Sequence, residues 1–410
     1  MNFHKTFFLV LLVCCFFACK KDKTSEPTPD PCAGVATLVA PLQRIWSTPN
    51  QYYNAYFKPI FFGNEVIFSQ LGGDYENELV GLDVKTGTLN WHTKAPGKIT
   101  EKNSQLQGNL LYWVDDKNNA FVSFDLNSRI VQTLWTCDSV GAVISPNFQL
   151  INGEVLLAIA YPTNVTNFKN IALVRVQLQT GKETELYRSK MLFTNFDDLG
   201  ILGLQTTVTS EGDTLAVFAR TEYDLNIGSV SRLMALNIQN KNTKLDIALP
   251  YNYKVGAGKL IVKGNQAWLR LAQNDVLDRL ACFNLINGAI TWTVTTSKLN
   301  DVILIEDKLI ELSNYSTRAL NAQTGAEIWR QGGGIYNALL AEGSIFDFEG
   351  RLFLIRNYSV MQLDLETGCV LNNQPISLLS TQDLIFGYAK SATEKVLYLS
   401  TWQQMIAVQL

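Results

Sequence analysis

The sequence predicts an all-β fold: an eight-bladed β-propeller of four-stranded antiparallel blades, closed by pairing of its N- and C-terminal strands. Three features lead to this prediction. Short alternating apolar runs recur along the chain, one turn motif repeats at a nearly constant spacing, and the two chain ends carry complementary parts of one repeat. The 410 residues are 47% hydrophobic and only 17% charged, a composition typical of a well-buried globular protein.

The repeated motif is clearest at Ala319–Trp329, and weaker copies lie at Gly81–Trp91 and Cys282–Trp292. An apolar strand leads into a polar turn, in which an Asx residue bonds the backbone and a glycine supplies positive φ. A tryptophan on the next strand then offers a flat surface for packing between stacked sheets. The residues expected to shape the blades are Asp83, Gly87, Trp91, Asn284, Gly288, Trp292, Asn321, Gly325, Trp329, Asp364 and Gly368.

Eight copies of this motif follow one another with a mean spacing of about 47 residues, which matches one four-stranded propeller blade. No pattern of helical period lies between them. The polar residues that anchor the copies are Asp83, Asp125, Gln177, Asn237, Asn284, Asn321, Asp364 and Gln409.

The two ends of the chain complete each other. The last repeat stops at Leu410, where its third strand should end, so its outer strand is missing. Residues Leu42–Trp46 look like such an outer strand with its tryptophan, and they precede the first complete repeat at Lys58–Lys94. We expect Leu42–Trp46 to pair with Trp402–Leu410, because this pairing closes the ring and removes two sheet edges.

Hairpin turns mark the inner strands of the repeats, at Gly63-Asn64, Gly264-Asn265 and Glu349-Gly350. The longest insertions, Tyr161–Asn170 and Tyr223–Ser231, lie in the third and fourth repeats between the second and third strands. Long irregular insertions are where a propeller commonly carries its binding contacts. The residues predicted to anchor a partner there are Tyr161, Phe168, Tyr223 and Arg232.

The N-terminus has the pattern of a bacterial lipoprotein. Residues 1–18 read as a signal peptide, with an apolar run at Phe7–Phe17 that is too short to span a bilayer. The ending Phe16–Cys19 resembles a lipobox, which implies lipidation of Cys19; ordinary secretion with cleavage nearby is the alternative. Residues 19–37 then read as a flexible tether, rich in charge and proline, ahead of the propeller at 38–410.

The residue after the lipidation site indicates which membrane holds the lipid anchor. Lys20 stands where an aspartate favours retention in the inner membrane. We therefore expect a lipid anchor in the outer membrane of a Gram-negative envelope, with the protein facing either the periplasm or the exterior.

Besides Cys19, the mature chain keeps Cys32, Cys137, Cys282 and Cys369, and spacing alone allows three pairings. Topology favours a disulfide between Cys32 and Cys369. Cys369 follows the outer turn of the seventh repeat, and Cys32 leads toward the strand placed on the eighth, at the same face. Cys282, on a predicted inner strand, is expected to be a buried free thiol.

The repeated pattern Ala-x-Asp/Asn-x-x-Thr-Gly-x-x-x-Trp resembles the pyrroloquinoline-quinone-type propeller repeat, over about Leu42–Leu410. That family includes quinoprotein alcohol dehydrogenases and the propeller lipoprotein of the outer-membrane β-barrel assembly machinery. The resemblance implies the propeller fold and leaves the activity open, since the shared residues shape blades.

The sequence offers no site for the quinone. In the dehydrogenases it stacks on a disulfide between adjacent cysteines and shares a calcium ion with a carboxylate, whereas the only adjacent pair here, Cys14-Cys15, lies in the signal peptide. His92, the single histidine of the mature chain, is expected at an exposed strand end. Asp115–Asn119 lacks the glycine and distal glutamate of an EF-hand and is expected to be a hairpin turn. We therefore predict no catalytic residue, cofactor or metal site.

Three classes of function fit these features. The first is a non-catalytic envelope lipoprotein, a monomer within a complex, that binds or scaffolds a protein, a peptide or a glycan; outer-membrane protein assembly is the model that the resemblance supplies. The second is a quinoprotein-like or other enzyme that uses the central funnel, and the third is a purely structural role. A formal net charge of −3 gives no reason to expect a nucleic-acid partner.

Overall fold

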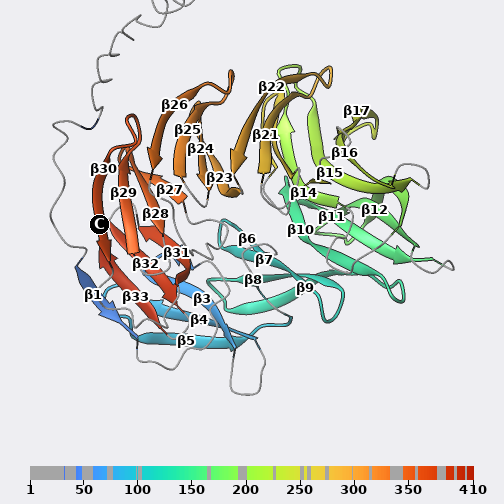
Figure 1. The fold of residues 1–410 in the computed structure, drawn as a ribbon. Helices are drawn as coiled ribbons and strands as arrows, with labels where there is room; N and C mark the ends of the chain where they lie inside the picture. Colours follow the sequence, from blue (N-terminus) through green and yellow to red (C-terminus); the bar gives the residue numbers. More distant parts are fainter. Residues whose placement is uncertain are drawn as a thin grey trace, which may run out of the picture.

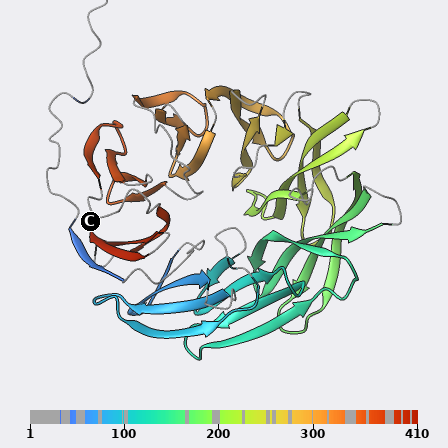
Figure 2. The same ribbon diagram turned by 60° about the horizontal axis from the view of Figure 1, so that its bottom comes forward.

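The structure is a computed structural model that describes residues 32, 43–48, 59–71, 77–97, 99, 104–163, 168–192, 201–224, 228–249, 254–255, 260–272, 277–297, 299–313, 316–332, 345–355, 359–375, 385–391, 395–401 and 404–410. Within these ranges every regular element is a β-strand, and the strands form eight antiparallel sheets. Figure 2 shows the sheets as the blades of a ring, in the order of the sequence. The predicted all-β, eight-bladed propeller is confirmed. The predicted signal peptide (1–18), Cys19 and the tether, apart from Cys32, lie outside the described residues.

Blades 1 to 4 each hold four consecutive strands (Figure 1). Blade 1 contains β2 (Ile60–Phe62), β3 (Glu65–Leu71), β4 (Asn77–Asp83) and β5 (Leu89–Lys94). Blade 2 contains β6 (Ser104–Gln107), β7 (Leu110–Asp115), β8 (Ala120–Asp125) and β9 (Ile130–Thr136). Blade 3 contains β10 (Val143–Ile151), β11 (Glu154–Pro162), β12 (Phe168–Gln177) and β13 (Glu183–Leu192). Blade 4 contains β14 (Ile201–Val208), β15 (Thr214–Asp224), β16 (Gly228–Asn237) and β17 (Thr243–Ala248).

Blades 5 to 7 continue this order, with the first strand of blade 5 in two pieces. Blade 5 contains β18 (Lys254–Val255), β19 (Ile261–Lys263), β20 (Gln266–Ala272), β21 (Leu277–Asn284) and β22 (Ile290–Ser297). Blade 6 contains β23 (Leu299–Ile305), β24 (Lys308–Ser313), β25 (Ser316–Asn321) and β26 (Glu327–Gly332). Blade 7 contains β27 (Ile345–Phe348), β28 (Arg351–Ile355), β29 (Ser359–Asp364) and β30 (Val370–Pro375).

Blade 8 combines the two ends of the chain. β31 (Ile385–Ser391), β32 (Val396–Thr401) and β33 (Met405–Gln409) come from the C-terminus, and β1 (Arg44–Ser47) supplies the outer strand from the N-terminus. β1 lies beside β33 and runs antiparallel to it (Figure 1). In this pairing Trp46 lies opposite Ala407. The predicted closure of the ring by its terminal strands is confirmed.

The core lies between neighbouring blades because each middle strand buries both faces. In β20, Ala267, Leu269 and Leu271 pack with apolar residues of blade 4, whereas Trp268 packs with those of blade 6. The alternation of side chains along a strand therefore joins each blade to its two neighbours.

The outer turn has the geometry that the repeated motif predicts. Asn321 Oδ1 accepts hydrogen bonds from the backbone N–H groups of Gln323 and Thr324, at 3.0 and 2.9 Å. Gly325 N donates to the Asn321 carbonyl at 2.8 Å and adopts a φ of +71°. The turns that begin at Asp83, Asn284 and Asp364 repeat these bonds.

Three of these turns receive a tryptophan from the preceding blade. Each indole lies on the turn glycine and donates its N–H to a backbone carbonyl of the same turn, so the glycine must lack a Cβ. The pairs are Trp46 on Gly87, Trp292 on Gly325 and Trp329 on Gly368, with the carbonyls of Val84, Ala322 and Leu365 at 2.8, 3.0 and 2.9 Å.

The contact between blades 1 and 2 departs from this pattern. Arg129 occupies the glycine position of the blade 2 turn with a φ of +63°. Its guanidinium lies 4.3 Å from the Trp91 ring centroid, and Trp91 Nε1 donates to Glu65 Oε2 at 2.9 Å. A cation–π contact here replaces the packing of an indole on glycine.

We predict that Gly325→Ala destabilises the protein more than Gly350→Ala does. Both glycines have positive φ, so each variant carries a backbone strain of about 1 kcal/mol. A Cβ at Gly325 would lie 2.6 Å from the Trp292 ring, whereas one at Gly350 meets no atom within 4 Å. Moving the indole should add about 1–3 kcal/mol. If urea unfolding showed the same decrease in the free energy of unfolding for both variants, the proposed docking of Trp292 on Gly325 would be contradicted.

The carboxylates of the acidic turns give a pH dependence. Hydrogen bonds from Thr86 lower the pKa of Asp83, and those from Ser128 and Asn127 lower the pKa of Asp125. Their contribution to stability is therefore present above the unfolded-state pKa of about 3.9 and is lost as the pH falls through the lower folded-state values.

We predict that the double variant Asp83→Asn/Asp125→Asn loses less stability than the parent between about pH 4 and pH 2. Asparagine keeps the accepting oxygen, as Asn284 and Asn321 do, but does not titrate. Denaturant unfolding at a series of pH values measures the difference. Parallel pH profiles of parent and variant would show that these carboxylates make no pH-dependent contribution.

Candidate functional site

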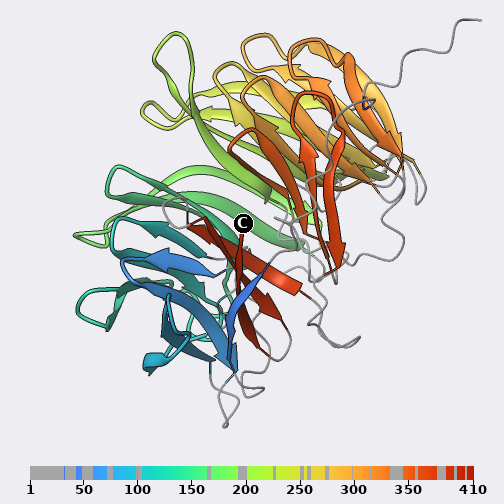
Figure 3. The ribbon, with the colours of Figure 1, turned by 90° about the vertical axis from the view of Figure 1, so that its left-hand side faces the viewer.

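Blades 3 and 4 differ from the others in their middle hairpins, β11–β12 and β15–β16, which we call the extended hairpins. The first pairs from Glu154↔Gln177 to Pro162↔Lys169, and the second from Leu215↔Asn237 to Asp224↔Gly228. The corresponding hairpin of blade 6 pairs only from Lys308↔Asn321 to Leu312↔Thr317. Figure 3 shows the yellow-green hairpin of blade 4 standing out at the edge of the ring.

The sequence predicts irregular insertions at Tyr161–Asn170 and Tyr223–Ser231, and this prediction is wrong for their described parts. Tyr161 pairs with Asn170, and Tyr223 pairs with Ser229, so both segments continue the strands. Pairing continues because the backbone N–H and C=O groups of the two strands remain hydrogen-bonded to each other in an unchanged register. Each insertion therefore adds surface to a sheet.

Tyr161 lies near the end of β11 with its ring against a charged side chain. The Arg188 guanidinium carbon is 4.8 Å from the ring centroid, and Arg188 Nε donates to Glu185 Oε1 at 3.1 Å. Burial raises the pKa of Tyr161 to about 12, so the phenol is neutral at physiological pH. Tyr161 is partly exposed and is available as an amphipathic contact.

Arg232 belongs to a bonded cluster between blades 3 and 4. Its Nε donates to Asp246 Oδ1 at 2.6 Å, and Asp246 Oδ2 lies 3.4 Å from Arg220 Nη2. Buried Arg220 also donates to Ser189 Oγ at 3.0 Å and to Tyr187 Oη in blade 3. The structure thus places Arg232 in a contact that holds two blades together.

Phe168 and Tyr223 complete the predicted set. Phe168 begins β12, opposite Leu192, and Tyr223 is the penultimate residue of β15. The structure brings Tyr161 and Phe168 to one extended hairpin, and Tyr223 and Arg232 to the other.

A second buried cluster, which is not among the predicted sites, lies between blades 5 and 6. Glu311 Oε2 accepts from Arg318 Nη2 at 2.7 Å, and Glu311 Oε1 accepts from Thr296 Oγ1 of blade 5. Arg318 Nη2 also donates to the Thr295 carbonyl at 3.0 Å. Burial raises the pKa of Glu311, against the opposing effect of Arg318. A charged residue inside the apolar run Lys308–Ser313 was the available signal.

The described residues do not fit the quinone group of the dehydrogenases. The disulfide joins Cys32 to Cys369, which are far apart in sequence and lie at an outer turn. The two free cysteines described, Cys137 and Cys282, are buried in different blades, and Cys282 is the buried thiol that its strand position predicts. Nothing here reproduces the adjacent-cysteine platform that the cofactor requires.

Other candidate catalytic groups are dispersed. His92 has an exposed side chain on β5, 3.9 Å from Glu78. Asp115 Oδ1 accepts from Lys117 N and Asn118 N in the turn between β7 and β8, as expected of a hairpin turn. Across the described part of the chain, no three His, Cys, Asp or Glu side chains converge as metal ligands. The same ranges hold no helix long and apolar enough to cross a membrane.

Comparison with known proteins identifies the repeat. The family model described as outer membrane protein assembly factor BamB matches residues 43–294, more than half of the chain. The crystal structure of BamB from Moraxella catarrhalis is similar with a TM-score of 0.56 and 12% identity, covering 90% of this chain and 98% of that one. The predicted resemblance to propellers of the quinone-repeat type is confirmed.

Two solved enzymes share the fold. Quinohemoprotein alcohol dehydrogenase from Comamonas testosteroni has a TM-score of 0.58 and 9% identity, covering 90% of this chain and 76% of that one. Dihydro-heme d1 dehydrogenase NirN in complex with DHE has a TM-score of 0.52 and 11% identity, covering 77% and 65%. At these identities the likeness shows the fold alone. No curated protein matches the sequence.

We predict that Asp246→Asn destabilises the protein by about 2 kcal/mol, because it removes the negative charge of a carboxylate that pairs with the buried Arg220 guanidinium. The matched control is Glu185→Gln, which removes a carboxylate from an ion pair with 41–42% exposed side chains. That change should cost less than about 1 kcal/mol. Equal effects of the two variants on urea unfolding would show that burial does not strengthen the Asp246 contact.

Proposed function

The chain belongs to the family of the outer membrane protein assembly factor BamB, and on that basis we propose that it is a non-catalytic, lipid-anchored scaffold of a Gram-negative envelope. Lipidation of Cys19 would attach it to the outer membrane. Its partner is an envelope protein or peptide, with a component or client of outer-membrane protein assembly as the first candidate.

The observation that carries this proposal is the contrast between the extended hairpins and the other blades. Blades 6 and 7 take part in the closed ring with short middle hairpins. The additional strand length in blades 3 and 4 is therefore not needed to close the ring. It adds surface at the end of the sheet away from the outer turns. Tyr161, with an apolar ring and a neutral hydroxyl, is the kind of side chain that anchors protein interfaces.

The alternative is a quinoprotein-like or other enzyme. It requires convergent carboxylates, a metal or an adjacent-cysteine platform, whereas the buried arginines described here, Arg220 and Arg318, pair with Asp246 and Glu311 inside their own blades. Adding the quinone with calcium to the purified protein tests it directly. A new absorbance band together with a raised melting temperature would favour the enzyme over the scaffold.

We predict that replacing Tyr161, Phe168 and Tyr223 together by serine abolishes capture of outer-membrane assembly components from detergent-solubilised envelopes. Arg232 is left in place because it holds Asp246. The matched control replaces three exposed apolar residues of other blades, Leu89, Ile286 and Ile328, by serine. Quantitative mass spectrometry of the captured proteins measures the effect.

Two outcomes would contradict this assignment. Unchanged capture by the triple variant would remove the extended hairpins from the interface. Equal loss in the control variant would point to general destabilisation, which urea unfolding of both proteins detects.

Capture of a glycan in place of a protein would keep the binding surface and change the ligand class. Cys19→Ser tests the anchor separately, through loss of membrane attachment and of labelling by fatty acid.

A further inference from the structure

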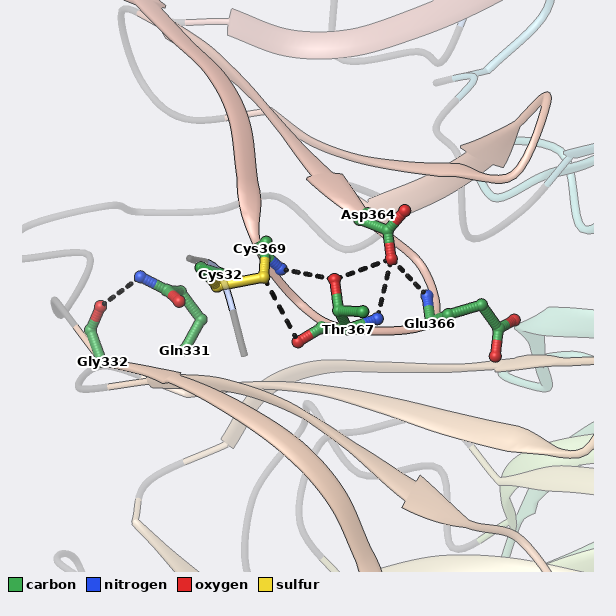
Figure 4. The surroundings of a disulfide bond; sticks show 7 residues. All are labelled: Cys32, Gln331, Gly332, Asp364, Glu366, Thr367 and Cys369. Atoms are coloured by element: carbon green, nitrogen blue, oxygen red, sulfur yellow. Dashed lines mark hydrogen bonds between the residues drawn. A yellow bond between two sulfur atoms is a disulfide. The ribbon is translucent and has the colours of Figure 1, made fainter. Parts of the chain in front are cut away.

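The outer turn of blade 7 differs from those of blades 1 to 6 in one residue, which is buried in blade 7 and exposed in the others. The residue that follows the turn glycine, or the residue in its place, is exposed in blades 1 to 6, where it is Thr88, Ile130, Lys182, Asn242, Ala289 or Ala326. In blade 7 this residue is Cys369, which is 0% exposed. Cys369 forms the disulfide with Cys32, with the Cα atoms 5.3 Å apart (Figure 4). Cys32 is therefore covalently bonded to blade 7.

The attachment point lies in a hydrogen-bonded turn that contacts the neighbouring blade. Cys369 N donates to Thr367 Oγ1 at 3.3 Å, and the Cys369 carbonyl accepts from Asp364 N at 2.9 Å. The preceding residue, Gly368, lies under the Trp329 indole of blade 6. Cys32 is thus fixed to the framework of the ring, and Figure 4 shows Gln331 of β26 beside the disulfide.

This attachment lies across the ring from the extended hairpins. The blades follow one another in chain order around the ring (Figure 2), so that blade 7 faces blade 3 and blade 8 faces blade 4 across the centre. The chain between Cys19 and Cys32 spans at most about 45 Å when fully extended. Apart from Cys32, the next described residue after Cys19 that contacts the ring is Gln43, whose carbonyl accepts from Gln409 N at 2.8 Å. The chain from Cys19 to Gln43 spans about 80 Å when fully extended.

We propose that the Cys32–Cys369 disulfide orients the propeller on the membrane. It makes the rim at blade 7 the side that meets the lipid surface and holds the extended hairpins of blades 3 and 4 away from the bilayer. This inference rests on the proposed lipid anchor at Cys19. It also narrows the partner class, because hairpins on the far rim meet a soluble domain or an unfolded chain in the aqueous compartment.

Two equivalent turn positions allow a direct test. Glu366 in blade 7 and Gln179 in blade 3 both lie two residues after the anchoring polar residue, and both are exposed. A donor dye is attached through a non-natural amino acid at one of these positions in the full lipidated chain, reconstituted into vesicles with an acceptor on the lipid headgroups. We expect greater energy transfer from position 366 than from position 179.

The disulfide is then removed by Cys32→Ser/Cys369→Ser, with Cys137→Ser as a control that replaces a buried thiol elsewhere. The difference between the two positions should shrink in the double variant and persist in the control. Equal transfer from both positions in the disulfide-bonded protein, or greater transfer from 179, would overturn the proposal. A difference that persists unchanged in the double variant would also overturn it, since orientation would not depend on the bond.

A second arm separates this inference from the proposed lipid anchor. The segment through Cys19 is replaced by a histidine tag and bound to vesicles that contain a nickel-chelating lipid. Greater transfer from position 366 in this form would support orientation by the disulfide whatever the native anchor is, and equal transfer would overturn it. Absence of fatty-acid labelling at Cys19 would contradict the anchor alone.

Discussion

The ring depends on contact between an outer-strand side chain of one blade and the outer turn of the next. A tryptophan can approach the turn only where glycine leaves room for its ring, and its N–H then bonds a carbonyl that the turn leaves open. This pair of contacts fixes both the distance and the rotation between sheets. Where the tryptophan is missing, Leu245 and Ile247 fill the same space against Gly288. The requirement is therefore that apolar side chains fill the space over the turn glycine, and more than one kind of side chain does so.

Closure of the ring uses this contact between the ends of the chain. Trp46 comes from the N-terminal strand, and its indole shares the Val84 carbonyl with the hydroxyl of Tyr398, at 2.8 and 3.5 Å. Blade 8 is therefore completed only when residues more than 350 positions apart have met. Contacts of such sequence separation form late, because the loop entropy must be overcome first. The Cys32–Cys369 bond, with a separation of 337, reinforces this closure at the neighbouring blade.

The sequence was sufficient to predict the architecture because its determinants are local and repeated. The Asx residue, the glycine and the tryptophan of Asn321–Trp329 act within one turn, and the copies in phase reveal the number of blades. The extended hairpins were harder to predict. Tyr161–Asn170 is one of the longest insertions, which predicts a loop, whereas its described residues 161–162 and 169–170 pair with each other in the sheet. Glu311 and Arg318 face each other in the β24–β25 hairpin, but their contacts with Thr296 and Thr295 join adjacent blades, and no single-sequence pattern indicates that contact.

The end of the ring that carries the outer turns is joined by a repeated kind of contact, whereas the opposite end is joined by individual polar contacts, and this difference locates the variable surface. At the outer turns, an indole docks on glycine between three pairs of blades, and Arg129 packs on Trp91 between blades 1 and 2. Toward the opposite end, polar contacts such as Arg220 to Tyr187 and Glu311 to Thr296 cross between blades. Arg220 lies in the β15–β16 hairpin, well away from the turn at Asn237. The extended hairpins project from this end, so changes at their tips leave the repeated docking contacts intact. The propeller can therefore acquire a binding surface there without losing the interaction that closes the ring.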